Sequence, residues 1–228
     1  NNYVGHKGCI DRNGHGNDLV TGDGRGVENV VIDSVRLNDM LGDNLHGTQI
    51  AVWLAQTKDG SATKKVKVTN LVSMLTRGDG INFHGNVQDS VVENCHIENT
   101  GDDIFAVWGG YMNPTGIVFR NNVGKNAGVT RNFGYGVCIA VYGARDVEFT
   151  GTTCYDPKQN PRCAHGPFCN SCLAYVHDNY FGAVYPSGNT ISFTDNKYLN
   201  MDGSKVSDGR PMVRSDVHKG SKAHIVQS

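Results

Sequence analysis

Val91-Val92-Glu93-Asn94-Cys95-His96-Ile97 is the stretch that decides the fold, because it is one copy of a pattern that returns along the chain. In each copy, alternating apolar residues lead to a polar residue at which the pattern bends, and the alternation then resumes. The other copies are residues 30–37, 66–72, 117–123, 147–153 and 191–196. Val91 follows Val66 by 25 residues, and Ile117 follows Val91 by 26. A period of this length is typical of stacked supersecondary units.

The composition favours strands and sharp corners over helices. The chain has 29 Gly, and Asn, Asp, Thr and Val are frequent while Leu, Glu and Ala are sparse. Gly and Asn tolerate the left-handed backbone conformation of tight corners, whereas leucine-rich and helical repeats need residues that are missing here. We therefore predict an all-β fold, a right-handed parallel β-helix (a solenoid) that forms a single domain over residues 1–228. Its core should include Val91, Ile97, Ile117 and Val147.

The cysteines indicate an oxidising compartment. Four of the seven, Cys154, Cys163, Cys169 and Cys172, lie within 19 residues. We predict a secreted, extracellular protein with at least one disulfide in this cluster, which would pin a loop insertion at residues 155–187. The spacing of Cys163, His165, Cys169 and Cys172 also resembles a zinc site, the less favoured alternative. Cys95 and Cys138 lie in strand-like runs and are predicted to be buried free thiols.

Charge and hydropathy exclude two classes of partner. The net charge is −1 and Lys and Arg form no basic run, so we expect no nucleic acid partner. No 18 consecutive residues are apolar, so we expect no membrane span. The chain begins at Asn1 without an apolar leader, which is expected of a processed or truncated chain. Residues 202–228 are polar and are expected to form a tail or cap.

Two segments carry the candidate chemistry, residues 77–85 and 99–108. Asp79 and Asp102 are 23 residues apart, which is about one coil, so they should occupy matching positions on neighbouring coils. We expect Asp79, Asp102 and Asp103 to converge on one solvent-facing groove, with a backbone bend next to Gly101. Crowded carboxylates raise one another's pKa, so that one acid stays protonated beside an ionised base, as glycosidases require. Alternatively, these Asp residues only hydrogen-bond the corner backbone.

Gly-Asp-Gly-Ile-Asn (residues 78–82) and Thr-Gly-Asp-Asp (residues 100–103) resemble the catalytic core of glycoside hydrolase family 87, the α-1,3-glucanases and mycodextranases. The resemblance is clearest over residues 66–143. It implies a right-handed β-helix that hydrolyses an α-glucan, with α-1,3 linkages expected, by inversion and without cofactor or metal. Asp102 matches the general acid, and Asp79 and Asp103 match the carboxylates that activate water. Polygalacturonases and family 49 dextranases are similar in their three clustered Asp.

Further residues are candidates for binding sugar. His84 could orient a sugar hydroxyl or be a corner residue. Trp53, Trp108 and Tyr135 could be sugar-stacking platforms or could pack in a ladder. A ladder is suggested by three similar apolar runs, which end in Trp53, Trp108 and Tyr142. Arg131 could pair with the Asp cluster or be solvated.

Two other functional classes remain open. One is a non-catalytic extracellular β-solenoid, a structural fibre or adhesin with a vestigial sugar site, whose open ends would invite end-to-end self-assembly. The other is a polysaccharide lyase, which would need an Arg or Lys base together with Ca²⁺, and no such pair stands out in the sequence.

Overall fold

The computed structural model describes residues 25–37, 50–55, 57, 59–130, 136–156, 173–178, 189–206, 212–217 and 223–228. Within these ranges the chain is all-β and contains no helix. Consequently, no described segment is a long apolar helix of the kind that crosses a membrane. The predicted sugar-binding residues Arg131 and Tyr135 lie outside the described residues, as do Cys163, Cys169 and Cys172 of the cysteine cluster.

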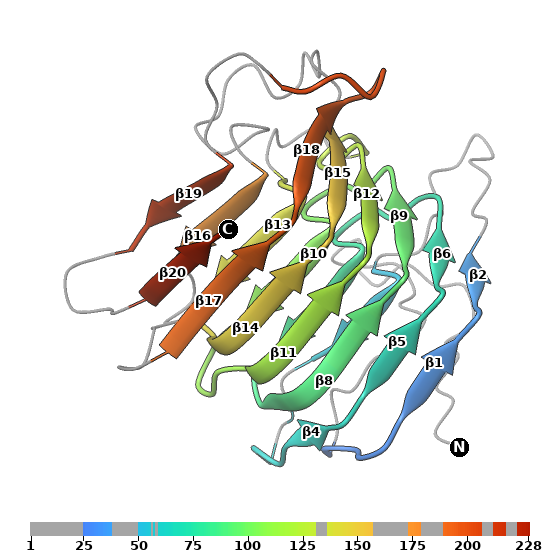
Figure 1. The fold of residues 1–228 in the computed structure, drawn as a ribbon. Coiled ribbons are helices and arrows are strands. Elements are labelled where there is room, and N and C mark those ends of the chain that lie inside the picture. The colour runs from blue at the N-terminus through green and yellow to red at the C-terminus, as the bar shows by residue number, and fades with distance from the viewer. Residues whose placement is uncertain are drawn as a thin grey trace.

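The strands form three sheets that the chain visits in a fixed order, again and again (Figure 1). Sheet 1 contains β1 (Val31–Asp33), β4 (Thr63–Lys64), β5 (Lys67–Thr69), β8 (Val87–Glu93), β11 (Thr115–Arg120), β14 (Arg145–Thr150), β17 (Asn189–Thr194) and β20 (Ala223–Gln227). Sheet 2 contains β2 (Arg36–Leu37), β6 (Val72–Ser73), β9 (His96–Glu98), β12 (Val123–Lys125), β15 (Thr153–Asp156) and β18 (Lys197–Asn200). Sheet 3 contains β3 (Val52–Leu54), β7 (Ile81–His84), β10 (Phe105–Trp108), β13 (Ile139–Tyr142), β16 (Ala174–His177) and β19 (Val213–Asp216).

Neighbouring strands in all three sheets are parallel and follow one another in chain order. Each coil therefore lies on the one before it, as the stack of coloured arrows in Figure 1 illustrates. This arrangement is consistent with the predicted parallel β-helix. β16 falls within the range predicted as an insertion, and β19 and β20 fall within the predicted tail, where they extend sheets 3 and 1.

A single left-handed residue makes the corner between sheet 1 and sheet 2 in each coil. These corner residues have φ between 54° and 63°, and they are Ser34, Asn70, Asn94, Asn121, Gly151 and Asp195. They coincide with the polar residues at which the sequence pattern bends, so the predicted corners are confirmed. Asn and Gly are suited to this conformation because it costs them less than other residues.

The apolar core lies between the sheets and is stacked coil on coil. Phe119 packs on Phe149 with ring centroids 4.6 Å apart, and Phe149 packs on Phe193 at 5.6 Å. Ile97, Ile117 and Val147 are buried as predicted, but Val91 is only half-buried and Val92 takes the core position. The prediction for Val91 is wrong because the register pairs Val91 with outward-facing Val118, and not with Ile117.

A disulfide joins Cys138, just before β13, to Cys154 in β15, with 6.1 Å between the Cα atoms. Both residues are buried, so the bridge links sheet 3 to sheet 2 through the interior. The prediction of a free thiol at Cys138 is wrong, because the stacking of coils brings Cys138 next to Cys154 in space. Cys95 is a buried free cysteine, as predicted. With Cys154 bonded outside the cluster, a disulfide among Cys163, Cys169 and Cys172 stays a prediction.

Phe119→Ala should destabilise the protein by about 3–5 kcal/mol, because it removes a fully buried ring from the stacked core. Val118→Ala, at the neighbouring half-buried and outward-facing position, is the matched control and should cost less than about 1 kcal/mol. Urea denaturation followed by circular dichroism measures both. Equal losses of stability in the two variants would contradict the assigned facing of β11.

Peptide mapping without reductant should recover a Cys138–Cys154 cross-linked peptide. Cys95 should be alkylated only after unfolding, because its thiol is buried. Alkylation of Cys154 in the unreduced, denatured protein would contradict the bridge.

Candidate functional site

The chain reaches the candidate site through a second left-handed corner, between sheet 2 and sheet 3. Asn99 and Asn126 hold this corner in successive coils with φ of 56° and 58°. The amide of Asn126 donates to Oδ1 of Asn99 at 2.7 Å, and the amide of Asn99 donates to the Met74 carbonyl at 3.0 Å. The corner is thus fixed on three coils, and it leads directly into residues 100–103.

The register of sheet 3 decides which carboxylates stack. Ile81 pairs with Phe105, an offset of 24 residues, and the backbone N–H of Gly80 donates to the Asp103 carbonyl at 2.9 Å. Asp79 therefore lies at the level of Asp103, while the Asp102 N–H donates to the Gly78 carbonyl at 3.2 Å. The predicted match of Asp79 with Asp102 is wrong by one residue, because inter-coil hydrogen bonds and not the average coil length set the register.

The three carboxylates nevertheless come together. Asp79, Asp102 and Asp103 each place one carboxylate oxygen within 4.8 Å of the others. The chain is bent at Gly101 and Asp102, and β10 begins only at Phe105, so Asp102 and Asp103 are not held on opposite faces of a strand. A Cβ at position 101 would overlap the Arg77 carbonyl oxygen, so this close approach requires glycine. The predicted bend is confirmed.

Asp103 is the most deeply buried of the three, with 2% of its surface exposed. Its Oδ1 accepts the Val137 N–H at 2.8 Å, and its Oδ2 accepts the Tyr142 hydroxyl at 3.1 Å. Burial and, second, the negative charge of Asp79 raise the pKa of Asp103 to about 8. Burial and the same carboxylates hold the pKa of Tyr142 well above its usual range. Burial therefore favours the neutral form of Asp103.

Asp79 is held by two N–H donors from within the site. Its Oδ1 accepts the backbone N–H of Asp103 at 3.1 Å, and its Oδ2 accepts the side-chain amide of Asn82. Asn82 is 4% exposed, and its Oδ1 has no hydrogen-bond partner among the described residues. Asn82 was not singled out from the sequence, although it ends the Gly-Asp-Gly-Ile-Asn segment three residues after Asp79.

Exposure separates Asp102 from the other two carboxylates. Asp79 is 6% exposed and Asp103 is nearly inaccessible, while Asp102 is partly exposed. The prediction that all three face solvent is therefore wrong for Asp79 and Asp103. Both are buried, because their carboxylates point at backbone N–H and side-chain donors of their own and neighbouring coils. Asp103 does not enter the central core, because its partners Val137 and Tyr142 belong to a separate apolar cluster.

The outer face of sheet 3 carries most of the predicted sugar-binding residues that the structure describes. His84 pairs in register with Trp108, and Trp108 with Tyr142. The rings of Trp108 and Tyr142 meet edge-on at 5.3 Å, and those of His84 and Trp108 at 6.0 Å. Burial lowers the pKa of His84, which keeps its ring neutral at pH 7. His84 and Trp108 are both partly exposed.

Trp53 does not join this row. It pairs in register with Asn82, two residues before His84, on the same outer face. The predicted aromatic ladder thus holds for Trp108 and Tyr142 and continues to Tyr175, whose ring lies 6.0 Å from that of Tyr142. The spacing of the aromatic residues alone did not show that Tyr142 lies next to the carboxylates. Aligning the strands by register would have shown it.

The carboxylates could in principle hold a hard cation, since each offers an oxygen within 4.8 Å of the others. Ca²⁺ takes six to eight oxygen ligands. All four carboxylate oxygens of Asp79 and Asp103 already accept hydrogen bonds from protein groups. The carboxylates are therefore better placed to share a proton than to coordinate a cation.

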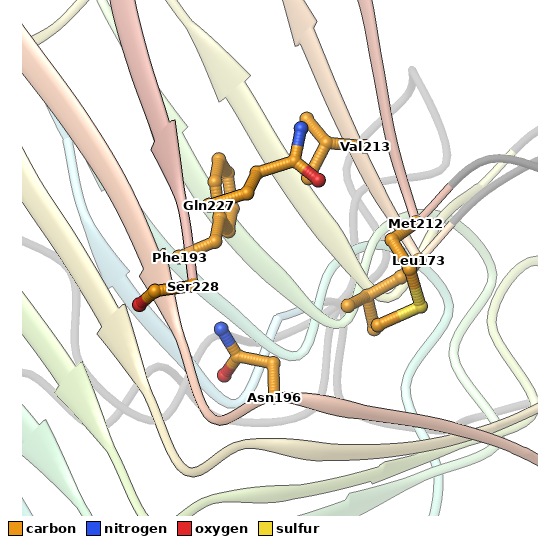
Figure 2. Close-up of a pocket in the computed structure, with 7 residues that line it drawn as sticks. All are labelled: Leu173, Phe193, Asn196, Met212, Val213, Gln227 and Ser228. Carbon is orange, nitrogen blue, oxygen red and sulfur yellow. The ribbon is translucent and has the colours of Figure 1, made fainter.

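A pocket lies at the other end of the stack, on the last described coil (Figure 2). Its lining residues come from the edges of β17, β19 and β20 and from the segments beside them, and they are Leu173, Phe193, Asn196, Met212, Val213, Gln227 and Ser228. In sheet 3, β13 and β16 separate β19 from β10, so the pocket is distinct from the carboxylates.

No known protein family, curated protein sequence or solved structure matches the chain.

The pH dependence of stability should depend on Asp103. The unfolded chain releases this proton near pH 3.8 and the folded protein near pH 8, so the folded state holds more protons in between. Stability from this group is fully present below about pH 4 and is lost as the pH rises to 8, by up to about 1.4 kcal/mol per pH unit. Asp103→Asn should flatten this decline in the free energy of unfolding.

Asp216→Asn is the matched control, because Asp216 also accepts a tyrosine hydroxyl, from Tyr175 at 3.0 Å, but lies on β19. Chemical denaturation at pH 4, 6 and 8 gives the slopes. Parallel curves for wild type and Asp103→Asn would show that Asp103 ionises normally in the folded protein.

Proposed function

We propose that this protein is a secreted glycoside hydrolase that acts on an α-glucan, with α-1,3 linkages as the first candidate, by inversion. The convergence of Asp79, Asp102 and Asp103, with burial favouring the neutral form of Asp103, is the observation that carries the proposal. The scaffold in this proposal is a right-handed parallel β-helix. Its support is the ordered visit to three parallel sheets, since crossover connections between parallel strands are almost always right-handed.

Asp102 is the general acid in this mechanism, because it is the carboxyl group that a substrate can reach. It donates a proton to the glycosidic oxygen as the bond from that oxygen to the anomeric carbon breaks. Asp79 is the base that takes a proton from the attacking water, since two N–H donors favour its charged form. Asp103 stays neutral and holds the water together with Asp79, which departs from the base role that the family resemblance implies for Asp103.

The distances set a condition on this mechanism. Acid and base in inverting enzymes are commonly about 6.5–9.5 Å apart. The nearest oxygens of the three carboxylates are within 4.8 Å, which is closer. One water that makes two hydrogen bonds of about 2.8 Å joins oxygens about 4.5 Å apart. Oxygens at the upper end of the 4.8 Å range would hold a water directly between two carboxylates, and the configuration of the product decides between inversion and retention.

Sugar binding is proposed for side chains on the outer face of sheet 3, at the ends of β7 and β10 that lie away from the carboxylates. His84 and Trp108 are partly exposed and in ring contact, so one sugar ring could stack on the indole while the neutral imidazole bonds a hydroxyl. Trp53 lies on the same face, two strands from Trp108. Secretion is supported by the buried Cys138–Cys154 disulfide, since such bridges persist in oxidising compartments.

The second candidate function is a non-catalytic extracellular β-solenoid. The burial of Asp79 and Asp103 favours it, because buried corner carboxylates can serve the fold alone. End-to-end association is the assembly proposed with this candidate, because the edge strand of a parallel sheet can pair with a strand of another chain.

Asp102→Asn should lower the rate of α-1,3-glucan hydrolysis by about 10²–10⁴-fold while leaving stability nearly unchanged, because it removes a partly exposed general acid. The matched control is Asp146→Asn, which changes an exposed carboxylate in a left-handed position that Asn also tolerates. Reducing-sugar release measures the rate. Proton NMR of the first product should detect the β-anomer.

Three outcomes decide between the candidates. An α-anomer as first product would refute inversion and leave a retaining hydrolase. Equal activity of Asp102→Asn and Asp146→Asn would refute the assigned acid. Release of no sugar by the wild-type protein from α-1,3-, α-1,4- and α-1,6-glucans would favour the structural solenoid, and sedimentation of end-to-end assemblies would then be the measurement to make.

A further inference from the structure

Tyr142 contacts the candidate site from the coil that follows it. The residue lies at the end of β13, four positions beyond Cys138, yet its hydroxyl reaches Oδ2 of Asp103, which precedes β10. The ring packs in one apolar cluster with Ala106, Ala140 and Tyr175. Because Ala106 and Ala140 are the outward-facing residues between the two ends of the strands, their small side chains leave room for the ring.

We propose that Tyr142 is a positioning residue that directs the proton of Asp103 toward Asp102 and Asp79. This inference rests on the proposed hydrolase function, in which a carboxyl proton has to be held next to the general acid. The sequence interpretation treated Tyr142 only as a stacking aromatic, so the role is new for this residue.

The hydrogen bonds of Asp103 carry the argument. Each carboxyl oxygen has two lone pairs, and one on each oxygen is taken, by Val137 N–H on Oδ1 and by Tyr142 O–H on Oδ2. Both donors come from the following coil. The proton of a neutral Asp103 must then occupy a lone pair that those donors leave open, and oxygens of Asp79 and Asp102 are close enough, within 4.8 Å, to face it.

The direction of this proton matters for turnover. When Asp102 has given its proton to the leaving group, Asp79 has gained one from water. Resetting the site requires one proton to move from Asp79 to Asp102, and a neutral Asp103 between them can accept one and release another. The net change in Asp103 is zero, so the proton count balances without any further reactant.

Among the described residues, Arg77 is the cation nearest in the chain to Asp79, and its carbonyl oxygen lies against Gly101, the residue before Asp102. Asp79 precedes β7, Asp102 precedes β10, and Tyr142 itself is on β13. Along the same outer face, His84 on β7 and His177 on β16 are the nearest titratable rings in the aromatic row. Beyond them on β19, Asp216 is paired with Arg214 at 2.8 Å. The pKa of Asp103 is set by burial first, then by the charge of Asp79 and by the hydrogen bonds from Val137 and Tyr142.

Tyr142→Phe tests the inference, and Tyr175→Phe is its matched control. Both changes remove one hydroxyl that donates to a carboxylate, but only the first touches Asp103. The bond from Tyr142 favours the ionised form of Asp103, so its loss should raise the midpoint of the Asp103 titration by about one pH unit. Carbon-13 NMR of labelled aspartate carboxyls measures this midpoint, with Asp103→Asn to assign the signal.

Kinetics give the second readout. In Tyr142→Phe, kcat on α-1,3-glucan should fall about tenfold with KM unchanged, and the alkaline limb of the pH profile should move upward. Tyr175→Phe should keep the wild-type profile. The effect of Tyr142→Phe on the pH dependence of unfolding should vanish in an Asp103→Asn background, which separates proton placement from a general loss of packing.

The outcomes are distinct. An Asp103 midpoint that is the same in wild type and Tyr142→Phe would overturn the inference, as would an equal shift in Tyr175→Phe. A shifted midpoint in a protein whose wild-type form cleaves no glucan would support the Tyr142–Asp103 pair and refute the hydrolase.

Discussion

The structure depends on one constraint, the stacking of a left-handed corner residue of each coil on that of the next. The corner turns the chain from sheet 1 to sheet 2 within one residue, which would leave buried backbone groups unpaired. Buried amides supply the missing partners: Asn122 accepts the Cys95 N–H at 2.9 Å and donates to the Val92 carbonyl at 3.1 Å. Asn196 makes the same pair of bonds two coils later, to Thr152 and Phe149. These amides fix the register, and the register fixes everything stacked above it.

The candidate site uses the same inter-coil bonds as the fold. Asp79 accepts the backbone N–H of Asp103, so the pairing of two coils and the spacing of two carboxylates are one interaction. Asp103 in turn is held by donors of the next coil. Burying two carboxyl groups side by side is costly unless one is neutral and both are hydrogen-bonded. Three successive coils meet this requirement together, so the acid pair exists only in the stack.

The sequence predicted local features of the fold well and inter-coil features poorly. Alternation and the polar bends located the strands and corners, because both are properties of a few consecutive residues. The facing of Val91, the partner of Asp79 and the partner of Cys138 were wrong, since each depends on which residue of the next coil lies opposite. Three strands of sheet 1 also contain a left-handed residue, namely Asp89, Gly116 or Asp146. The alternation of apolar and polar residues does not reveal them. The contact between Tyr142 and Asp103 was missed for the same reason.

The dependence of Asp103 on the following coil has a consequence for biosynthesis. Tyr142 lies 39 residues after Asp103, so a chain emerging from the ribosome exposes the aspartates well before their donors. During that interval the carboxyl groups are hydrated and charged, and they repel one another. The electrostatic cost falls only when residues 137–142 dock as the next rung. In a chain that folds from its amino terminus, the acid pair is therefore complete only after residues 137–142 have docked.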